Sequence, residues 1–410
     1  MKTLFISYNG AAEPLMQSQG IPYLRVLSAE GVGVTLLSFE KARKKNTSVN
    51  IDILKRDLAD RGIEWYRLRY HKRPTFPATL FDILQGIFFG IFIILKEDIN
   101  IIHARSTVPA AIGYALSKIL RKKFIFDERG LMAEEYVDGG MWNKNSVVYK
   151  LTLYFEKKFL KNADGVVVLS DNIRVFLKDS FYIKNWNVHK KDRMTVIPSC
   201  VDMNRFRPIY NLDLRQRCGL QDKFVFLYSG SLGTWYLVEE MLEFFTCAKE
   251  AIPNAHFYFL VHEGRHIVEA ACIRKRLSLS DVTITSVTPM DMPAYISMAD
   301  AGIFFIKPCF SKRSSCPTKF AEYLSCGLPV LINKGIGDTA EVVERNKIGF
   351  VVGNFTKEEY AEGASLILKY SNDGDVKKRC VETAERLFSL ERGAHLYLGL
   401  YNKVFQKTEL

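Results

Sequence analysis

The segment PTKFAEYLSCGLPVLI, residues 317–332, places a short helical pattern directly before an apolar strand. Pro317 suits the first position of a helix, because its missing N–H would have no partner there, and Gly327 suits the stop. Lys319 and Glu322 lie three residues apart on one helix face, beside a face of apolar side chains with helical spacing. The pattern predicts a helix–strand unit of an α/β fold.

Glu322 stands in the last turn of this predicted helix, where its charge faces the negative end of the helix dipole. An exposed carboxylate in that position costs about 0.3–1 kcal/mol. Two interpretations follow from the helix alone, a solvated surface pair with Lys319 or a binding site. The segment by itself does not decide between them.

Further strands surround this unit in the second half of the chain. Apolar runs alternate with helical patterns. The apolar runs, which are the predicted strands, are KFVFLYSGSLG (223–233), HFYFLVHEG (256–264), DVTITSV (281–287) and AGIFFIKP (301–308). Strands separated by helices form parallel sheets. We therefore predict a Rossmann-like domain over residues 206–385.

The first half of the chain repeats the same alternation. Its predicted strands lie at residues 2–8, 33–39, 99–104, 124–130, 165–170 and 194–202. This pattern predicts a first doubly wound α/β domain over residues 1–205, and the polar stretch NRFRPIYNLDLRQR (204–217) is the expected link. We expect a ligand in the cleft between two such domains, where the carboxyl ends of the strands converge.

Length and composition fit this division. The 410 residues exceed the size of one core, and 48% hydrophobic with 25% charged residues is ordinary for a globular protein. The apolar run GIFFGIFIIL (86–95) is interpreted first as a buried helix and second as a membrane-touching one. The N-terminal MKTLFISYNG lacks the features of a signal peptide and matches a first strand, so we expect a cytoplasmic protein.

The net charge of +12 is concentrated in the first half. Residues 1–200 hold 31 Lys and Arg against 20 Asp and Glu, and the rest of the chain is nearly balanced. The basic clusters are KARKK (41–45), RLRYHKR (67–73), RKK (121–123) and the KK pairs at 157–158 and 190–191. They suit anionic lipid headgroups or phosphorylated acceptors, with solubility as the alternative. A nucleic-acid partner is not expected, because no aromatic-basic motif accompanies the charge.

The cysteines do not indicate a metal site. All eight fall at or after Cys200, with no CxxC pair and no Cys/His cluster at metal-ligand spacing. We therefore expect no disulfide framework, no zinc and no metal cofactor.

Candidate site residues in the first domain lie at predicted strand ends. Gly10 begins a small-residue turn suited to close approach by a diphosphate or sugar. His103 and Arg105 end one strand and Arg129 follows the next, so these three are the predicted catalytic residues. For His103 a satisfied core histidine is an equal alternative.

Five segments occur in an order that resembles one known family: VIPSCVDMNRF (196–206), YSGSLGTWY (228–236), ADAGIFFIKP (299–308), PTKFAEYLSCGLPV (317–330) and GDTAEVV (337–343). They resemble the retaining nucleotide-sugar glycosyltransferases of family 4, and the resemblance covers nearly the whole chain. It implies the GT-B architecture, in which two Rossmann-like domains face each other across a cleft. It also implies that the last helix, at 386–410, packs back on the first domain.

The resemblance implies roles for the donor-binding residues. Glu322 corresponds to a carboxylate that accepts hydrogen bonds from the ribose hydroxyls of the donor, and Lys319 is placed to reach the diphosphate. Gly230, Ser231 and Thr318 complete the donor-binding set. Arg105 stands where many relatives have a sugar-contacting His.

The chain departs from the family pattern at three positions. The first carboxylate of the family's Glu-x7-Glu pair falls at Ser314, and the two basic residues of the glycine turn fall at Ser231 and Leu237. We expect another cation to replace them, namely Lys319, Lys312 or Arg313.

The resemblance implies transfer of a sugar from a UDP- or GDP-type donor to a glycan or lipid-linked acceptor with retention, in synthesis of cell-surface polysaccharide or glycoconjugate. No cofactor or metal is required, and peripheral contact with an anionic membrane is expected through the basic half. Two alternatives stay open, a GT-B nucleotide-sugar epimerase and a degenerate nucleotide-binding protein.

Overall fold

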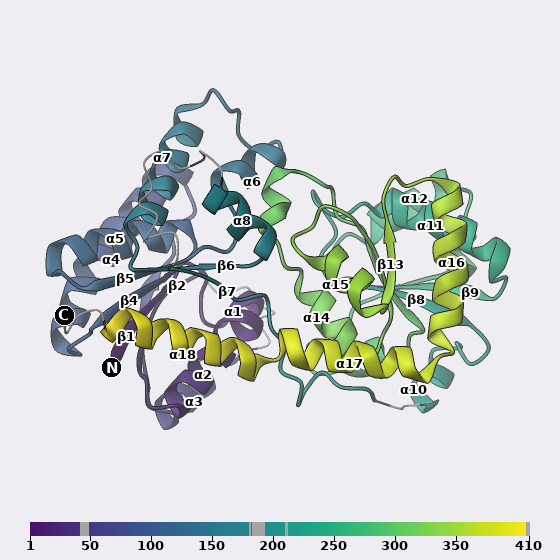
Figure 1. Cartoon of the computed structure of the whole chain (residues 1–410), viewed down its shortest axis with the longest axis horizontal. Coiled ribbons are helices and arrows are strands. Elements are labelled where there is room, and N and C mark those ends of the chain that lie inside the picture. The colour runs from purple at the N-terminus through teal and green to yellow at the C-terminus, as the bar shows by residue number, and fades with distance from the viewer. Residues whose placement is uncertain (42–48, 180–181, 183–192, 210–211, 407–410) are drawn as a thin grey trace. The chain divides into compact units, whose positions relative to one another are not determined.

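The computed structural model describes residues 1–41, 49–179, 182, 193–209 and 212–406 (Figure 1). The chain divides into two compact units, the first comprising Met1–Pro198 and the chain from Leu390 onward, and the second Ser199–Ser389. The division lies between Pro198 and Ser199, somewhat before the predicted boundary at residue 205. Most of the basic cluster at 41–45 and the whole pair at 190–191 lie outside the described residues.

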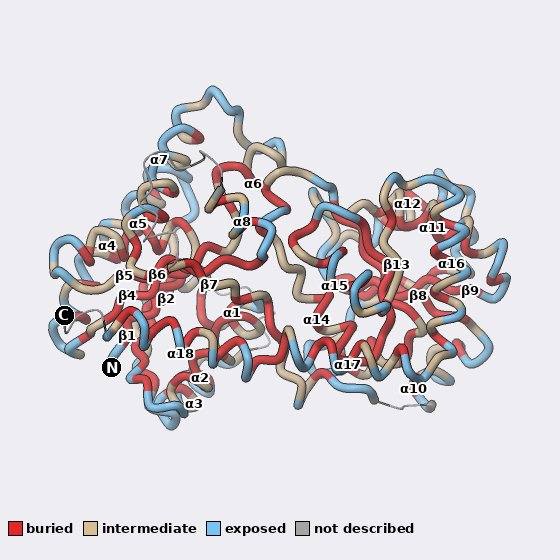
Figure 2. The backbone as a smooth tube through the Cα atoms, viewed as in Figure 1, coloured by how far each residue is buried: buried red, intermediate tan, exposed pale blue. Residues whose placement is uncertain are grey.

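Unit 1 contains a parallel sheet in the order β3-β2-β1-β4-β5-β6-β7. Its strands are β1 (Lys2–Ser7), β2 (Gly33–Glu40), β3 (Ile63–Arg69), β4 (Ile101–Arg105), β5 (Lys123–Asp127), β6 (Gly165–Val168) and β7 (Met194–Val196). The order reverses between β1 and β4, as in dinucleotide-binding folds. The central strands are buried on both faces, which explains uninterrupted apolar runs such as GVVV of β6 (Figure 2).

Helices cover both faces of this sheet. They are α1 (Pro14–Gln19), α2 (Ile21–Ala29), α3 (Ile51–Asp60), α4 (Thr75–Lys96), α5 (Thr107–Leu120), α6 (Met132–Asp138), α7 (Val147–Asn162), α8 (Asp171–Asp179) and α18 (Leu390–Gln406). Right-handed crossovers place α2 and α3 on one face and α4, α5 and α7 on the other, because the strand order reverses between them. The C-terminal helix α18 packs beside α2 (Figure 1).

Unit 2 contains a second parallel sheet in the order β10-β9-β8-β11-β12-β13. Its strands are β8 (Phe224–Ser229), β9 (Ala255–Leu260), β10 (Val282–Thr285), β11 (Ala301–Phe304), β12 (Val330–Asn333) and β13 (Gly349–Val352). Two parallel sheets in two α/β units confirm the predicted fold class.

The helices of unit 2 follow the same alternation. They are α10 (Leu212–Arg217), α11 (Val238–Ala251), α12 (Arg265–Arg274), α13 (Met292–Ser297), α14 (Thr318–Ser325), α15 (Thr339–Asn346), α16 (Lys357–Ser371) and α17 (Gly374–Phe388), with short 3₁₀ helices η1 (Leu279–Asp281) and η2 (Phe310–Ser314). The last helix predicted at 386–410 is thus two elements. α17 ends unit 2, and α18 begins after Ser389 in unit 1.

The interpretation of residues 86–95 as a buried helix is wrong. They belong to α4, a helix long and apolar enough to cross a membrane by length and composition, and only 33% of its most apolar window is buried. Large side chains such as Phe88 and Leu95 are exposed. The helix packs through one narrow face and leaves the other uncovered.

Close packing between β11 and α14 fixes the helix of the opening segment. A Cβ on Gly302 of β11 would lie 2.3 Å from a ring carbon of Tyr323 on α14, so only glycine allows this approach. The Tyr323 hydroxyl also accepts a hydrogen bond of 2.7 Å from the backbone N–H of Ser229 at the end of β8. These contacts hold α14 against β11 and against the carboxyl end of β8.

Replacing Gly302 with Ala tests this packing. The new methyl group forces Tyr323 and α14 to shift, and we expect a loss of about 1–3 kcal/mol in the free energy of unfolding by urea titration. The matched control is Gly374→Ala at the start of α17, where an added Cβ meets nothing within 4 Å. That variant is expected to be neutral or slightly stabilised. Equal stability of the two variants would contradict the packing argument.

Candidate functional site

The helix α14 begins and ends close to the predicted positions. Pro317 is the N-cap residue rather than the first helical residue, and α14 runs from Thr318 to Ser325. Gly327 follows the helix with a φ of +74°, the left-handed conformation that favours glycine at a helix end. The first turn therefore presents Thr318 and Lys319, with Glu322 one turn later on the same side.

Lys319 is buried between two aromatic rings. Its side chain is 5% exposed, and Nζ lies 3.7 Å from the ring centre of Tyr236 and 3.9 Å from that of Tyr228. Within the described part of the chain Nζ has no hydrogen-bond partner. Burial lowers the pKa of Lys319 well below its usual value, and the Glu322 carboxylate opposes part of that effect.

The glycine turn after β8 lies against the same ammonium group. Gly230 has a φ of +114°, and a Cβ on it would lie 3.3 Å from Lys319 Nζ. The Tyr228 hydroxyl donates a hydrogen bond of 2.6 Å to the Ser231 carbonyl, which ties the turn to its strand. Lys319 thus brings a cation to a turn whose own residue Ser231 carries no charge.

Glu322 stands beside two cations and keeps part of its surface exposed. Burial raises the pKa of Glu322 to about 6, although the charges of Arg205 and Lys319 oppose the shift. The carboxylate is therefore mostly ionised at neutral pH and can act as an acceptor of two hydrogen bonds. Sequence reasoning missed Arg205, although it lies inside the quoted segment VIPSCVDMNRF.

The three candidate replacements for the missing basic residues lie in different environments. Lys319 is next to the glycine turn, as described above. Lys312 of η2 is 6% exposed, and its Nζ lies 3.7 Å from the ring centre of Trp235, which is in the segment between β8 and α11. Arg313 is exposed. Ser314, at the position of the missing carboxylate, is fully buried in η2.

In unit 1 the predicted catalytic residues surround one buried carboxylate, Asp127. Asp127 accepts hydrogen bonds from the Tyr397 hydroxyl at 2.9 Å and from Arg105 Nη1 at 3.2 Å. Burial alone would raise the pKa of Asp127, but the charges of Arg129 and Arg105 and a hydrogen bond from His103 hold it below its usual range. The cluster joins β4, β5 and α18 into one unit.

His103 belongs to the core of this cluster. It is 1% exposed, its Nδ1 lies 2.5 Å from the Tyr401 hydroxyl, and its Nε2 lies 3.4 Å from Asp127. Burial lowers the pKa of His103, which favours the neutral ring. Both ring nitrogens are engaged within the protein, as the core-histidine alternative requires.

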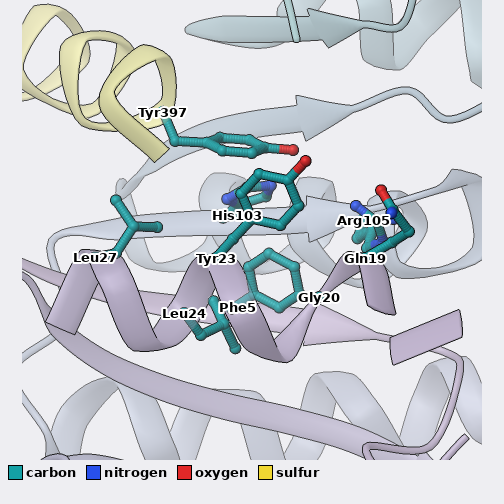
Figure 3. Close-up of a pocket in the computed structure, with 9 residues that line it drawn as sticks. All are labelled: Phe5, Gln19, Gly20, Tyr23, Leu24, Leu27, His103, Arg105 and Tyr397. Atoms are coloured by element: carbon teal, nitrogen blue, oxygen red, sulfur yellow. The ribbon is translucent and has the colours of Figure 1, made fainter. Parts of the chain in front are cut away.

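Arg105 and Arg129 lie nearer the edge of the cluster. Arg105 lines a small hollow together with Gln19 and the ring of Tyr23, with the Tyr397 hydroxyl above it (Figure 3). The Arg129 side chain is 11% exposed and its Nη1 lies 3.5 Å from Asp127. The structure thus brings the three predicted residues together around Asp127, which was not among them.

The turn at Gly10 is filled by carboxylates. The Gly10 N–H donates to Glu13 at 2.9 Å, and the Ala11 N–H donates to Glu40 at 2.7 Å. These amides were expected to approach a diphosphate or sugar. In this structure two negative groups hold them, so the turn offers an anion no free donor from either amide.

The described part of the chain contains neither a metal-binding cluster nor a disulfide. No group of three or more His, Cys, Asp or Glu side chains there is arranged to hold a metal ion. All eight cysteines lie among the described residues, four of them buried and four partly buried, and none of them forms a disulfide there.

Two family models match the chain. The model described as Glycosyltransferase Family 4 matches residues 23–205, and the model described as Glycosyl transferases group 1 matches residues 213–387. No curated protein sequence matches the chain significantly.

Solved structures share the fold over nearly the whole chain. Sucrose-phosphate synthase from Thermosynechococcus elongatus is 16% identical with a TM-score of 0.74, covering 99% of this chain and 100% of that one. A glycosyltransferase from Rickettsia africae is 17% identical with a TM-score of 0.71, covering 98% of both. Anabaena HepE in complex with UDP-glucose is 15% identical with a TM-score of 0.64, covering 100% of this chain and 99% of that one.

At this level of identity the solved structures show a shared GT-B fold and no more. The two family models go further, because they follow each other along the chain and leave only short segments unmatched. The chain therefore belongs to the family 4 glycosyltransferases.

Proposed function

We propose that the chain transfers a sugar from a UDP- or GDP-type nucleotide sugar to a glycan or lipid-linked acceptor, with retention of anomeric configuration. The observation that carries the proposal is the pairing of Lys319 and Glu322 on α14, beside the Gly230 turn. In this assignment Lys319 binds the diphosphate, and Glu322 accepts hydrogen bonds from the ribose hydroxyls. Gly230, Ser231 and Thr318 line the same part of unit 2.

The chemistry of the transfer needs a cation of this kind. Cleavage of a glycosyl–phosphate bond leaves negative charge on the departing diphosphate, and a fixed positive group stabilises that charge best where water is excluded. Lys319 is buried and contacts aromatic faces, so its amino group is held in place before the donor arrives. A carboxylate such as Glu322 can accept a hydrogen bond from each of the two hydroxyls of a vicinal diol.

Support for a uridine donor comes from a relative of the same fold. The solved structure of HepE contains UDP-glucose. The family resemblance supports retention by a front-face displacement, in which the leaving phosphate takes the acceptor proton and no metal is needed. The proposed setting is the cytoplasm, in synthesis of cell-surface polysaccharide or glycoconjugate.

Two alternatives make different predictions. A nucleotide-sugar epimerase would convert the donor without any acceptor, and a solved structure described as a putative UDP-N-acetylglucosamine 2-epimerase shares the fold with a TM-score of 0.62. A degenerate protein would bind no nucleotide sugar productively. The charge that Lys319 brings to the Gly230 turn favours an active donor site over a degenerate one.

Donor binding tests the assignment of the two charged residues. UDP, GDP and ADP are titrated into the full chain by calorimetry, and one of the first two is expected to bind. Glu322→Ala and Lys319→Met are each expected to weaken that binding by about 10-fold or more, because each removes a hydrogen bond to a charged group.

The matched controls for these variants are Glu385→Ala on α17 and Lys369→Met on α16, both at exposed positions of unit 2. They are expected to bind as the wild type does. If neither UDP nor GDP binds, or if the two α14 variants bind as tightly as their controls, the assignment fails. Turnover of a bound donor only when acceptor is supplied separates transfer from epimerisation.

Stability provides a second, independent prediction for Lys319. A buried ammonium without a hydrogen-bond partner carries a free-energy cost, because it has lost its hydration. Removing the ammonium removes this cost, which is larger than the favourable contact with the two rings that is lost at the same time. We expect Lys319→Met to raise the free energy of unfolding near pH 7 by about 1–3 kcal/mol.

The sign of the pH dependence follows from the pKa of Lys319, which is lower in the folded protein than in the unfolded chain. Between the two values the unfolded state binds more protons, so wild-type stability gains a contribution as the pH rises. That contribution should be absent from the pH profile of Lys319→Met, measured by urea unfolding. If Lys319→Met is less stable than the wild type, burial of the Lys319 charge does not destabilise the folded protein, and the prediction is wrong.

A further inference from the structure

The helix α4 presents a continuous apolar surface to solvent. Six of its side chains are 47–72% exposed: the adjacent Leu80 and Phe81, and then Leu84, Phe88, Phe92 and Leu95 at intervals of three or four residues. We call these six the α4 apolar face. At 1.5 Å per residue a helix of this length extends about 33 Å, so the α4 apolar face is a long stripe rather than an isolated contact.

The opposite side of α4 fixes this orientation. A Cβ on Gly86 would lie 2.6 Å from Ile112 of α5, and a Cβ on Gly90 would lie 2.5 Å from Leu116 of the same helix. The two helices therefore touch through the glycines and run in register. The six side chains of the α4 apolar face point away from this contact, whereas Ile93 and Ile94 of the same helix are buried in the core.

The surroundings of α4 exclude a crossing of the membrane. The helix connects β3 to β4 of one sheet. Its one acidic side chain, Asp82, is fully buried and accepts hydrogen bonds from the Tyr8 hydroxyl at 2.8 Å and from the His71 backbone at 3.0 Å. A helix held in this way can lie along a bilayer surface but cannot span it.

The exposed charges around the α4 apolar face are mainly positive, although Glu97, which pairs with Lys96 at 3.3 Å, and exposed Asp98 directly follow α4. The helices α4, α5 and α7 contain only two acidic residues, Asp82 and Glu156, and both are buried. Their exposed charged side chains are Lys96, Lys118, Lys150 and Lys161, and exposed Arg121 follows α5 directly. The register between α4 and α5 places Lys118 beside the C-terminal turns of α4.

We propose that α4 docks in the plane of a bilayer that contains anionic lipids. The α4 apolar face enters the boundary between headgroups and acyl chains, and the lysines of α4, α5 and α7 meet lipid phosphates. A second copy of the chain fits this surface less well. Two such faces would bring lysines together without an exposed acidic side chain on these helices to pair with them.

Vesicle binding of the full chain tests this proposal. Sedimentation with vesicles of phosphatidylcholine alone is compared with vesicles that also contain phosphatidylglycerol. We expect binding to the anionic vesicles to be at least about 10-fold tighter, and weakened by salt. The double variant Phe88→Ser/Phe92→Ser should lose binding by a further factor of about 10 or more.

The matched control removes two exposed apolar side chains from unit 2. Ile273 and Met290 are 70% and 80% exposed, so Ile273→Ser/Met290→Ser lowers surface hydrophobicity without changing α4. This control should bind anionic vesicles as the wild type does. Both double variants should keep the wild-type melting temperature, because none of the four residues is buried.

Three results would overturn the proposal. These are no binding of the wild type to anionic vesicles, equal binding by Phe88→Ser/Phe92→Ser, and a wild-type dimer in solution that this variant converts to a monomer. The last result would assign the α4 apolar face to a second copy. Nucleotide affinity of the same variant is expected to be unchanged, so failure here is distinguishable from failure of the donor-site assignment.

Discussion

Burial of the Lys319 ammonium between the rings of Tyr228 and Tyr236 is the constraint on which the candidate site depends. A charge in such a place is costly, and it persists only because the packing of α14 against β8 and β11 holds it there. The same burial makes the charge effective, since a cation excluded from water interacts strongly with an incoming anion. The burial of Lys319 therefore both lowers the stability of the fold and strengthens the binding of an anion.

Unit 1 uses buried charge differently. Around Asp127 the donors Arg105, Tyr397 and His103 all engage Oδ2 of the carboxylate, and they come from the strand β4 and the C-terminal helix. This network makes α18 part of the first unit although it is last in the chain. The solvent-facing side of the same unit, at α4, carries apolar and basic groups instead. Unit 1 thus has a polar network in its interior and a row of apolar side chains on its surface.

The sequence predicted the buried strands well, because apolar runs such as β6 leave few alternatives. It missed β3 and β13, which lie at the sheet edges, where side chains are partly exposed and the apolar signal weakens. It identified Lys319 and Glu322 but not the burial of Lys319, since the rings come from a distant segment. The core role of His103 depends on Tyr401, 298 residues away. The exposure of the large α4 side chains depends on the close packing of Gly86 and Gly90 against α5, which is a tertiary contact.

The most direct test of the central claim measures protons taken up when the nucleotide binds. UDP is titrated calorimetrically near pH 8 in buffers of different ionisation enthalpy, where Glu322, with a pKa of about 6, is already ionised. A diphosphate beside Lys319 raises the lowered pKa of that ammonium, so the wild type should take up protons and Lys319→Met should not. Equal proton uptake by both proteins would contradict the account.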